Sequence, residues 1–244
     1  MTPFAAEGET TRRERFLKQP SPNPNVERAI VRMRMHLRDS CRVKQSFSDG
    51  LLRRVWKWVQ VSRAALTRGR RIFFMGNGGS AADAQHIVAE LVGRFLRERP
   101  PLPAIALTTN TSSLTAIAND YGYEDVFERQ VRALVRRGDI VVGITTSGRS
   151  PNVLRALKAA RAKGAFTVGL TGAHGEELKI VAQLVIDVPS ESTPRIQESH
   201  ITIGHIFCDL LDICYPKTKR PRANKPRSAG RASGRQPPSQ QSPR

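Results

Sequence analysis

Apolar residues in the first part of the chain recur at helical spacing. Ile30, Met33 and Leu37 fall on one face of a predicted helix over residues 26–47, and a similar helix is predicted over residues 51–66. Polar residues, many of them arginine, occupy the other faces of both segments. This arrangement is typical of amphipathic helices at the surface of a folded domain.

From Arg71 onward, short apolar runs alternate with helical stretches. Such runs are typical of strands that are buried on both faces of a parallel sheet and joined by crossover helices. The alternation predicts an α/β fold, a three-layer sandwich in which helices cover both faces of a central five-stranded parallel sheet. The predicted strands are 72–75, 104–107, 140–144, 166–170 and 184–188. The predicted helices are 81–96, one that ends near residue 118, 124–135, 151–163, 176–181 and 195–214.

The 244 residues carry a formal net charge of +19, and nine bases but no acid lie in residues 216–244. This segment has no core-forming pattern and is predicted to be a disordered basic tail. Residues 1–24 are predicted to be a flexible arm, which leaves 25–215 as the folded domain. The tail could contact nucleic acid through its charge. Because the rest of the chain lacks an aromatic-rich RNA-binding motif, we favour a solvated appendage instead.

The apolar and cysteine patterns bear on the compartment. No apolar run approaches the roughly 20 residues that span a bilayer, and the first thirty residues lack the apolar stretch of a signal peptide. Cys41, Cys208 and Cys214 form no CxxC motif and cannot all pair, so no disulfide scaffold or zinc ribbon is indicated. We therefore expect a protein of the reducing cytoplasm that has no membrane partner.

A glycine-rich loop, Gly76-Asn77-Gly78-Gly79-Ser80, follows the first predicted strand and opens a helix. Glycines let the backbone approach an anion closely, and the first N–H groups of a helix are donors. The spacing of Gly76, Gly78 and Ala81 matches a dinucleotide fingerprint. However, the second strand ends in Thr108-Thr109-Asn110 and not in an acid for the ribose. We therefore expect a substrate loop and no nucleotide cofactor, with a turn that only packs helix on strand as the alternative.

A second polar loop, residues 145–152, follows the third predicted strand. Its four hydroxyl groups, its glycine and the proline at the start of the next helix suit a phosphate monoester. The alternative is that this Ser/Thr cluster is only an N-cap with ordinary turn residues. Because ligands of parallel sheets bind beyond the carboxyl ends of the strands, the two loops together predict a ligand of sugar-phosphate size.

Three segments carry a resemblance to a known family: residues 76–86, Thr146-Ser147-Gly148 and Arg195-Ile196-Gln197-Glu198-Ser199-His200. Together they resemble the sugar isomerase (SIS) domain family over about residues 26–214. The resemblance implies an aldose–ketose isomerase that converts sedoheptulose 7-phosphate to D-glycero-D-manno-heptose 7-phosphate. This reaction would be the first step towards nucleotide-activated heptoses for surface glycans. A homotetramer is also implied.

The resemblance assigns roles to individual residues. Glu90 and His205 match the catalytic pair. Some relatives carry a zinc ion, one in each subunit, whose ligands would correspond to His86, Glu90, Gln197 and His205. The residues that match substrate contacts are Asn77, Gly78, Gly79, Glu90, Asn119, Asp120, Thr145, Thr146, Ser147, Ser150 and Gln197.

The chemistry of isomerisation favours some of these residues independently. An enediol route needs a base near two adjacent carbons and an acid for the neighbouring oxygen. Glu90 would lie on the helix that the glycine loop opens, and His86 shares its face at a spacing that also suits two metal ligands. Gln197 and His205 are eight residues apart, about 12 Å along a straight helix. Either the helix begins after Gln197 or the two residues serve sites in different subunits, so we expect a site at a subunit interface.

Several alternatives stay open at this point. A relative, the replication initiator-associating protein, keeps the fold but is a non-catalytic scaffold; it lacks the residues that match Glu90 and His205, which favours the isomerase here. A sugar-phosphate-sensing regulator would bind ligand without turnover. Spacing does not choose between His200 and His205, whereas the resemblance favours His205. Arg149 stands where many relatives have Asn and Pro194 where some have an acid, which leaves the details of substrate fit open.

Overall fold

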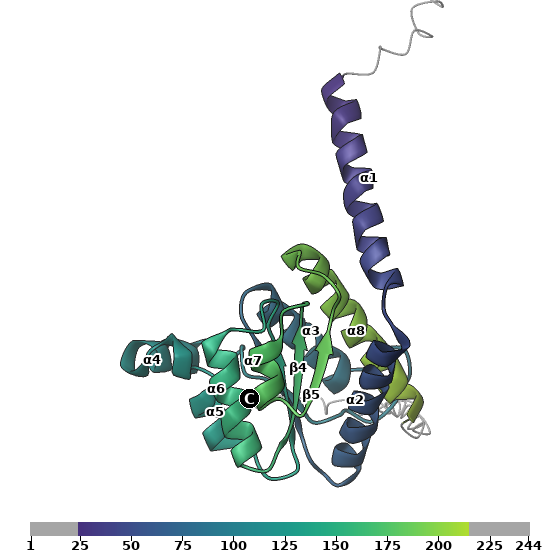
Figure 1. Cartoon of the computed structure of the whole chain (residues 1–244). Coiled ribbons are helices and arrows are strands. Elements are labelled where there is room, and N and C mark those ends of the chain that lie inside the picture. The colour runs from purple at the N-terminus through teal and green to yellow at the C-terminus, as the bar shows by residue number, and fades with distance from the viewer. Residues whose placement is uncertain (1–23, 215–244) are drawn as a thin grey trace, which may run out of the picture.

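The computed structural model describes residues 24–214, and its centre is a sheet of five parallel strands. The strand order is β2-β1-β3-β4-β5 (Figure 1), so the predicted α/β fold with a five-stranded parallel sheet is confirmed. Apart from Pro24, the predicted arm over residues 1–24 and the predicted tail over 216–244 lie outside the described residues. The strands are β1 (Ile72–Gly76), β2 (Ala104–Ala106), β3 (Ile140–Ile144), β4 (Phe166–Thr171) and β5 (Leu184–Asp187).

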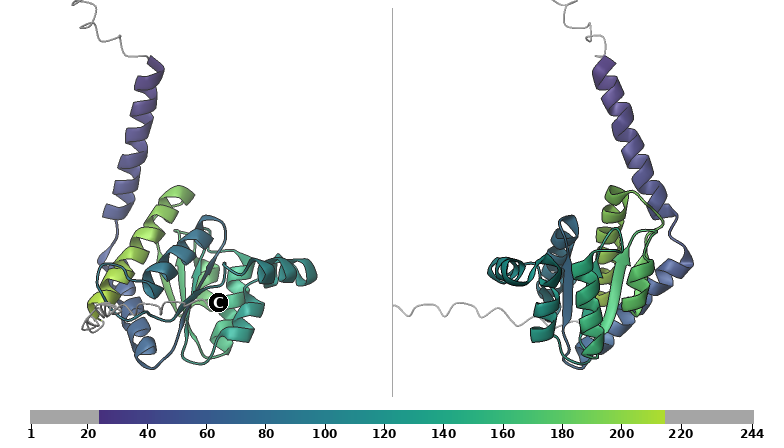
Figure 2. Two further views of the ribbon diagram at one scale, coloured as in Figure 1. Left: turned by 180° about the vertical axis from the view of Figure 1, so that it is seen from behind. Right: turned by 60° about the vertical axis from the view of Figure 1, so that its left-hand side comes forward.

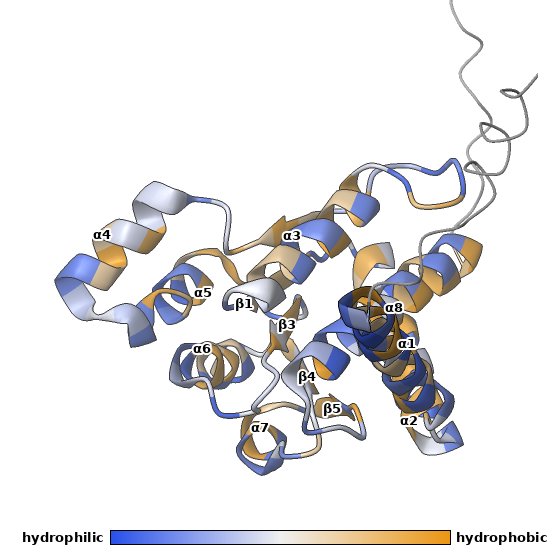
Figure 3. Ribbon diagram, turned by 90° about the horizontal axis from the view of Figure 1, so that it is seen from above, coloured by the Kyte–Doolittle hydropathy of each residue, from blue (hydrophilic) through white to orange (hydrophobic). Residues whose placement is uncertain are grey.

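Helices cover both faces of the sheet and bury a separate apolar cluster on each (Figure 3). Successive side chains of a strand point to opposite faces, so Ile72 and Phe74 enter one cluster while Phe73 and Met75 enter the other. The first face is covered by α2 (Asp49–Thr67), α3 (Gly79–Val92) and α8 (Thr193–Cys214). The second is covered by α5 (Glu128–Leu134), α6 (Pro151–Ala162) and α7 (Glu176–Val181).

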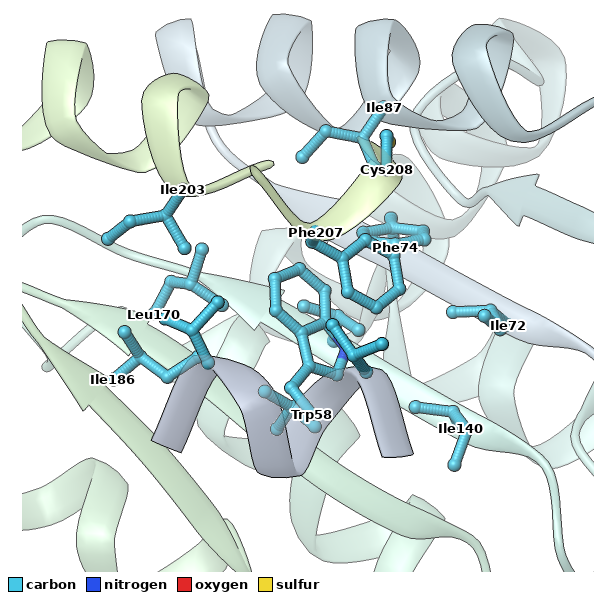
Figure 4. Packing of buried hydrophobic residues seen from close by; sticks show 14 of the residues in the cluster. Trp58, Ile72, Phe74, Ile87, Ile140, Leu170, Ile186, Ile203, Phe207 and Cys208 are labelled. Carbon is cyan, nitrogen blue, oxygen red and sulfur yellow. The ribbon is translucent and has the colours of Figure 1, made fainter. Parts of the chain in front are cut away.

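The first cluster is centred on aromatic packing between two helices far apart in sequence. Trp58 of α2 stacks on Phe207 of α8, with ring centroids 3.8 Å apart and planes inclined by 10° (Figure 4). Phe74 of β1 lies 6.2 Å from the same indole. Because all three rings are inaccessible to solvent, this contact fixes α8 against the sheet. The position of His205 therefore follows from the packing of the core.

The helix α1 (Pro24–Gln45) leaves the domain as an arm (Figures 1 and 2). None of its residues is buried, and five large apolar side chains are exposed: Val26, Val31, Met33, Met35 and Leu37. Near its end, the Lys44 ammonium lies 3.8 Å from a carboxylate oxygen of Glu198 on α8. The predicted amphipathic helix therefore forms, and Val43 packs against the domain, but these five apolar side chains stay exposed within the described chain.

Two helix predictions are wrong in their extent. The helix predicted over 81–96 ends at Val92, because Gly93 stops it and the buried Asp212 carboxylate accepts the backbone N–H groups of Leu96 and Arg97 at 3.2 Å. The helix predicted over 124–135 is split into a 3-10 turn, η2 (Tyr123–Asp125), and α5. Within residues 24–214, no helix is long and apolar enough to cross a membrane.

Candidate active site

The two polar loops lie side by side because β1 and β3 are neighbours in the sheet. Gly76 pairs in register with Ile144, so the glycine loop and the loop that begins at Thr145 leave the same edge. A Cβ atom at Gly76 would lie 2.9 Å from the Ile144 carbonyl oxygen and 2.7 Å from the Ser80 Cβ. Only glycine permits this close approach of the two loops. The predicted pair of loops at one edge is therefore present.

A network of side-chain amides joins the loops. Asn77 and Asn152 exchange two hydrogen bonds, from Nδ2 of Asn77 to Oδ1 of Asn152 at 3.0 Å and in the reverse direction at 2.8 Å. The Tyr123 hydroxyl donates to Oδ1 of Asn77 at 3.1 Å. Asn77 was predicted as a substrate contact, whereas neither Asn152 nor Tyr123 was assigned a role. The buried Asn152 at the start of α6 was the signal that could have been noticed, since a buried amide needs partners.

The hydroxyl groups of the second loop point towards one another. The Thr145 Oγ1 lies 2.8 Å from the Ser150 Oγ and 3.4 Å from the Ser147 Oγ. Ser150 occupies the N-cap position of α6, but its side chain makes no capping bond to the helix and contacts Thr145 instead. Gly148 has φ of +71°, and a Cβ there would lie 2.5 Å from the His174 carbonyl oxygen. The loop is thus a compact hydroxyl cluster whose shape depends on glycine.

A cavity of about 210 Å³ lies beside this hydroxyl cluster. Thr146 and Ser147 line it from the predicted loop, whereas Ser190 comes from the connection between β5 and α8 and Thr193 is the first residue of α8. Sequence reasoning missed these last two residues, although every strand of a parallel sheet ends at the same edge. Arg149 also lines the cavity, and its Nε lies 3.8 Å from a carboxylate oxygen of Glu177.

A second group of polar side chains, the His86–Glu90–His205 cluster, lies between α3 and α8. The Nε2 atoms of His86 and His205 are 2.8 Å apart, so one of them donates a hydrogen bond to the other. The same His86 nitrogen lies 3.5 Å from Oε1 of Glu90. The His86 side chain is 48% exposed and that of Glu90 25% exposed, so the cluster opens to solvent. The structure therefore brings the two predicted catalytic residues together through His86.

Gln197 lies elsewhere on the same helix. The helix α8 includes both Gln197 and His205, so the alternative in which the helix begins after Gln197 is wrong. A Cβ added to Gly79 would lie 2.5 Å from the Gln197 amide nitrogen, which places Gln197 against the glycine loop. Gly79 precedes His86 by seven residues, about 10 Å along α3. Gln197 therefore lies near the start of α3, whereas the His86–Glu90–His205 cluster lies farther along α3 and α8.

The four predicted zinc ligands do not form one centre in the described chain. The separation of 2.8 Å between the His86 and His205 nitrogens is that of a direct hydrogen bond, whereas ligand nitrogens about 2.0 Å from a tetrahedral zinc lie farther apart. Gln197 contacts the glycine loop instead. Among residues 24–214, no three His, Cys, Asp or Glu side chains are arranged to hold a metal ion. As arranged, these residues do not fit the predicted zinc site.

Asn119 and Asp120 were expected beside the sugar, but the single chain does not bring them to the loops. Both are exposed near the end of α4 (Thr111–Tyr121), which projects from the side of the domain (Figures 1 and 2). Their side chains bond to each other: Nδ2 of Asn119 donates a hydrogen bond to Oδ1 of Asp120 at 2.9 Å. The Tyr123 hydroxyl, two residues after α4, reaches Asn77 of the glycine loop, whereas no hydrogen bond joins Asn119 or Asp120 to either loop within residues 24–214.

Three ionisable groups near the site, the half-buried Asp83 and the buried His200 and Cys208, differ in their chemistry. Burial raises the pKa of Asp83 to about 6, against the opposing charge of His86, and its Oδ2 has no hydrogen-bond partner among the described residues. Burial lowers the pKa of His200 to about 4, and its Nε2–H donates to the Thr171 carbonyl oxygen at 3.1 Å. Burial raises the pKa of Cys208 to about 12, which excludes a reactive thiolate at neutral pH. His200 is therefore a neutral core residue, and His205 is the histidine at the open site.

Comparison with known proteins identifies the family to which this domain belongs. Residues 39–172 match the model of the SIS domain, so the fold and its polar edge define an α/β domain of the sugar isomerase class. A phosphoheptose isomerase of Nitratidesulfovibrio vulgaris (strain Miyazaki F) is 52% identical over 177 residues, which cover 72% of this chain and 85% of that protein. One from Aquifex aeolicus is 51% identical over 183 residues, 75% of this chain and 96% of that protein.

Solved structures agree with the sequences. A phosphoheptose isomerase structure from Neisseria gonorrhoeae matches with a TM-score of 0.72 and 42% identity, over 76% of this chain and 99% of that one. A phosphoheptose isomerase structure from Francisella tularensis gives 0.73 and 34%, over 76% and 98% of the two chains. The chain therefore belongs to the SIS domain family and, within it, to the phosphoheptose isomerases.

Proposed function

We propose that this chain is an aldose–ketose isomerase that converts sedoheptulose 7-phosphate to D-glycero-D-manno-heptose 7-phosphate, at the start of nucleotide-activated heptose synthesis. The observation that carries the proposal is the His86–Glu90–His205 cluster, in which α3, the helix that the glycine loop opens, meets α8. A carboxylate and an imidazole in contact are the acid–base pair that an enediol reaction needs. Relatives about half identical in sequence are named phosphoheptose isomerases, which supports the same reaction here.

The hydroxyl cluster of Thr145, Ser147 and Ser150 is suited to hold the phosphate of the substrate. Hydroxyl groups and the first N–H groups of α6 donate hydrogen bonds, and the dipole of α6 favours a dianion at its start. The phosphate does not react, so its binding energy serves to orient the reacting end of the sugar. The amide pair between Asn77 and Asn152 keeps the glycine loop at a fixed distance from this anchor.

Glu90 and His205 would then move the protons. The Glu90 carboxylate removes the C1 proton while His205 protonates the C2 carbonyl oxygen, which leaves an enediol between C1 and C2. Glu90 returns the proton to C2 and His205 takes the proton of the C1 hydroxyl, so a carbonyl forms at C1. His86 holds the His205 imidazole through the bond between their Nε2 atoms. Positioned acid–base groups of this kind contribute about 10²–10⁴ in rate.

The complete site would require more than one subunit. The His86–Glu90–His205 cluster is open to solvent, and Asn119 and Asp120 lie away from the loops of their own chain. The exposed apolar side chains of α1 need a partner, because an apolar face in water is unfavourable. A homo-oligomer built on α1, the tetramer that the family resemblance implies, would bury this face and bring a second chain to the site.

Zinc remains a prediction of the family resemblance, and no step above depends on it. The donor types of His86, Glu90 and His205 are those of zinc sites, but their present arrangement joins the two imidazoles directly. Elemental analysis of the protein purified without added metal measures the zinc content of each chain. A content of about one zinc per chain would show that these side chains rearrange around the ion.

A coupled assay with sedoheptulose 7-phosphate tests the proposed reaction. We expect turnover by the native chain and a loss of about 10²–10⁴ in kcat for Glu90→Gln, which keeps the shape of the side chain but removes the base. Glu98→Gln, at an exposed position after α3, is the matched control and should retain activity. Binding of the substrate without turnover would instead identify a sugar-phosphate sensor. Neither binding nor turnover would identify a scaffold.

A further inference from the structure

The edge of the sheet opposite the candidate active site carries a cavity of about 630 Å³. It is formed where the chain enters β1, β3 and β4. These strands are neighbours, so their three entry loops lie in a row. The cavity has the volume of a small-molecule site, typically about 300–1,000 Å³. Neither the isomerase proposal nor the family motifs use these loops.

Four arginines line this cavity, and the lining contains no carboxylate: Arg68, Arg70, Arg136 and Arg137. All four are exposed. Within residues 24–214, none of their guanidinium groups makes a hydrogen bond or an ion pair. Unpaired guanidinium groups at one cavity repel one another, and they bind phosphate oxygens readily through paired N–H groups. This basic cavity therefore has a concentrated positive charge that the described chain does not neutralise.

The nearest acid organises the arginine loops instead of neutralising them. The Asp139 side chain is 2% exposed, and its carboxylate accepts the backbone N–H groups of Arg71 at 3.0 Å and Arg136 at 2.8 Å. A guanidinium nitrogen of Arg71, which does not line the cavity, lies 3.3 Å from the same carboxylate. Both oxygens of this buried acid are thus occupied. The entry loops of β1 and β3 are consequently fixed to each other beneath the basic cavity.

Glycines in left-handed conformations set the position of two arginine side chains. Gly138 has φ of +85°, and a Cβ there would lie 3.3 Å from Nε of Arg70. Gly164 has φ of +78°, and a Cβ there would lie 3.0 Å from Cγ of Arg137. Each arginine therefore crosses the glycine of the next loop in the row. This arrangement orders the stems of both side chains before any ligand arrives, which reduces the entropy lost on binding.

The rest of the lining is apolar, with Ile140, Ala165 and Phe166 among the residues beneath the arginines. We propose that the basic cavity binds an organic polyphosphate, of the class of nucleoside di- and triphosphates. The four guanidinium groups would contact the phosphates, and the apolar lining would contact the base or sugar. The volume and the row of separate charges suit adjacent phosphate groups better than a single phosphate. The site lies at the opposite edge from the isomerase loops, so both ligands could bind one chain.

Calorimetric titration of the full-length protein tests this proposal with ATP, inorganic tripolyphosphate, adenosine and a single-stranded oligonucleotide as probes. We expect ATP to bind at one site per chain, tripolyphosphate to bind more weakly, and adenosine not to bind. The double variant Arg70→Ala, Arg137→Ala should weaken ATP binding at least about tenfold, because charge-assisted bonds are lost. The double variant Arg53→Ala, Lys57→Ala removes the same charge from exposed positions of α2 and should bind ATP as the native protein does.

Three results would overturn the proposal. ATP binding that survives loss of Arg70 and Arg137 would place the anion elsewhere, in the hydroxyl cluster or outside residues 24–214. Oligonucleotide binding that is tighter than ATP binding and is weakened in the Arg70→Ala, Arg137→Ala variant would identify a nucleic-acid surface at this cavity. Equal binding of adenosine and ATP would exclude a role for the arginines. The titration requires no turnover, so its outcome is independent of the isomerase assay, and the Arg70→Ala, Arg137→Ala variant should retain isomerase activity.

Discussion

The hydroxyl cluster of the second loop and the His86–Glu90–His205 cluster are built in different ways. The first uses residues close in sequence at the end of one buried strand, and its hydroxyl groups bond to one another within a single chain. The second joins two helices through residues 119 positions apart and stays open to solvent. The hydroxyl cluster thus forms within one chain, whereas the His86–Glu90–His205 cluster faces outward. A partner subunit can therefore change the second region far more than the first.

The largest expected effect is a loss of kcat on substitution of His205 but not of His200, which lies on the same helix. His205→Asn should lower kcat by about 10²–10⁴ with little change in thermal stability, because His205 lies at the open cluster. His200→Asn should instead lower the melting temperature, because His200 is fully buried and donates to the Thr171 carbonyl oxygen. Kinetics and thermal unfolding of both variants measure the difference. A folded His205→Asn protein with native kcat would remove His205 from the mechanism.

The next effect concerns whether the open cluster needs a second chain. Leu37→Glu places a charge on the exposed apolar face of α1 and should shift the native assembly towards a single chain of 27.1 kDa. Arg53→Glu places the same acid at an exposed position of α2, outside α1, and should leave the assembly intact. Light scattering after size exclusion gives the mass. We expect activity to fall together with the mass of Leu37→Glu.

Full activity of a monomeric Leu37→Glu protein would contradict the shared site. It would show that the His86–Glu90–His205 cluster is complete in one chain, as the hydroxyl cluster is. The two regions would then differ in their exposure to solvent but not in their need for a partner.

The sequence predicted the hydroxyl cluster better than the other region, for a physical reason. Apolar runs identify buried strands, and the residues that follow such a run must lie at the edge of the sheet, so the two loops could be located without coordinates. The pairing of Asn77 with Asn152 depends on β1 lying beside β3, which strand order and not chain order determines. Gln197 could not be separated from His205 by spacing, because the packing of α8 on α3 decides what each side chain reaches.

The residue at which a helix ends and the direction in which it points could not be predicted from the sequence either. Leu96 continues the helical pattern of α3, but Gly93 and the distant Asp212 carboxylate end the helix earlier. Asn119 and Asp120 lie on a helix of the expected type, yet α4 points away from the loops. Local patterns specify which element forms, whereas the direction of an element depends on contacts that the pattern does not contain.

A smaller effect tests the hydroxyl cluster itself. Thr145→Val keeps the shape of this buried side chain but removes the hydroxyl that joins Ser147 and Ser150. We expect KM for the sugar phosphate to rise about tenfold with a much smaller change in kcat, because a remote anchor is lost and the acid–base groups are intact. Thr67→Val removes an exposed hydroxyl at the end of α2 and should alter neither constant. A fall in kcat at constant KM would place Thr145 in the chemistry.

The smallest effect concerns Asp83, which lies on α3 between the glycine loop and His86. Its pKa is raised from 3.8 to about 6 in the folded protein, so between these values the folded chain binds a proton that the unfolded chain does not. The associated stability is fully present below about pH 4 and is lost as the pH rises through about 6. Asp83→Asn removes the half-buried charge and should raise the free energy of unfolding at about pH 8 by on the order of 1 kcal/mol, or about 2–4 °C in melting temperature. The gain should vanish at about pH 4, and an equal gain at both pH values would show that the charge of Asp83 is not its cause.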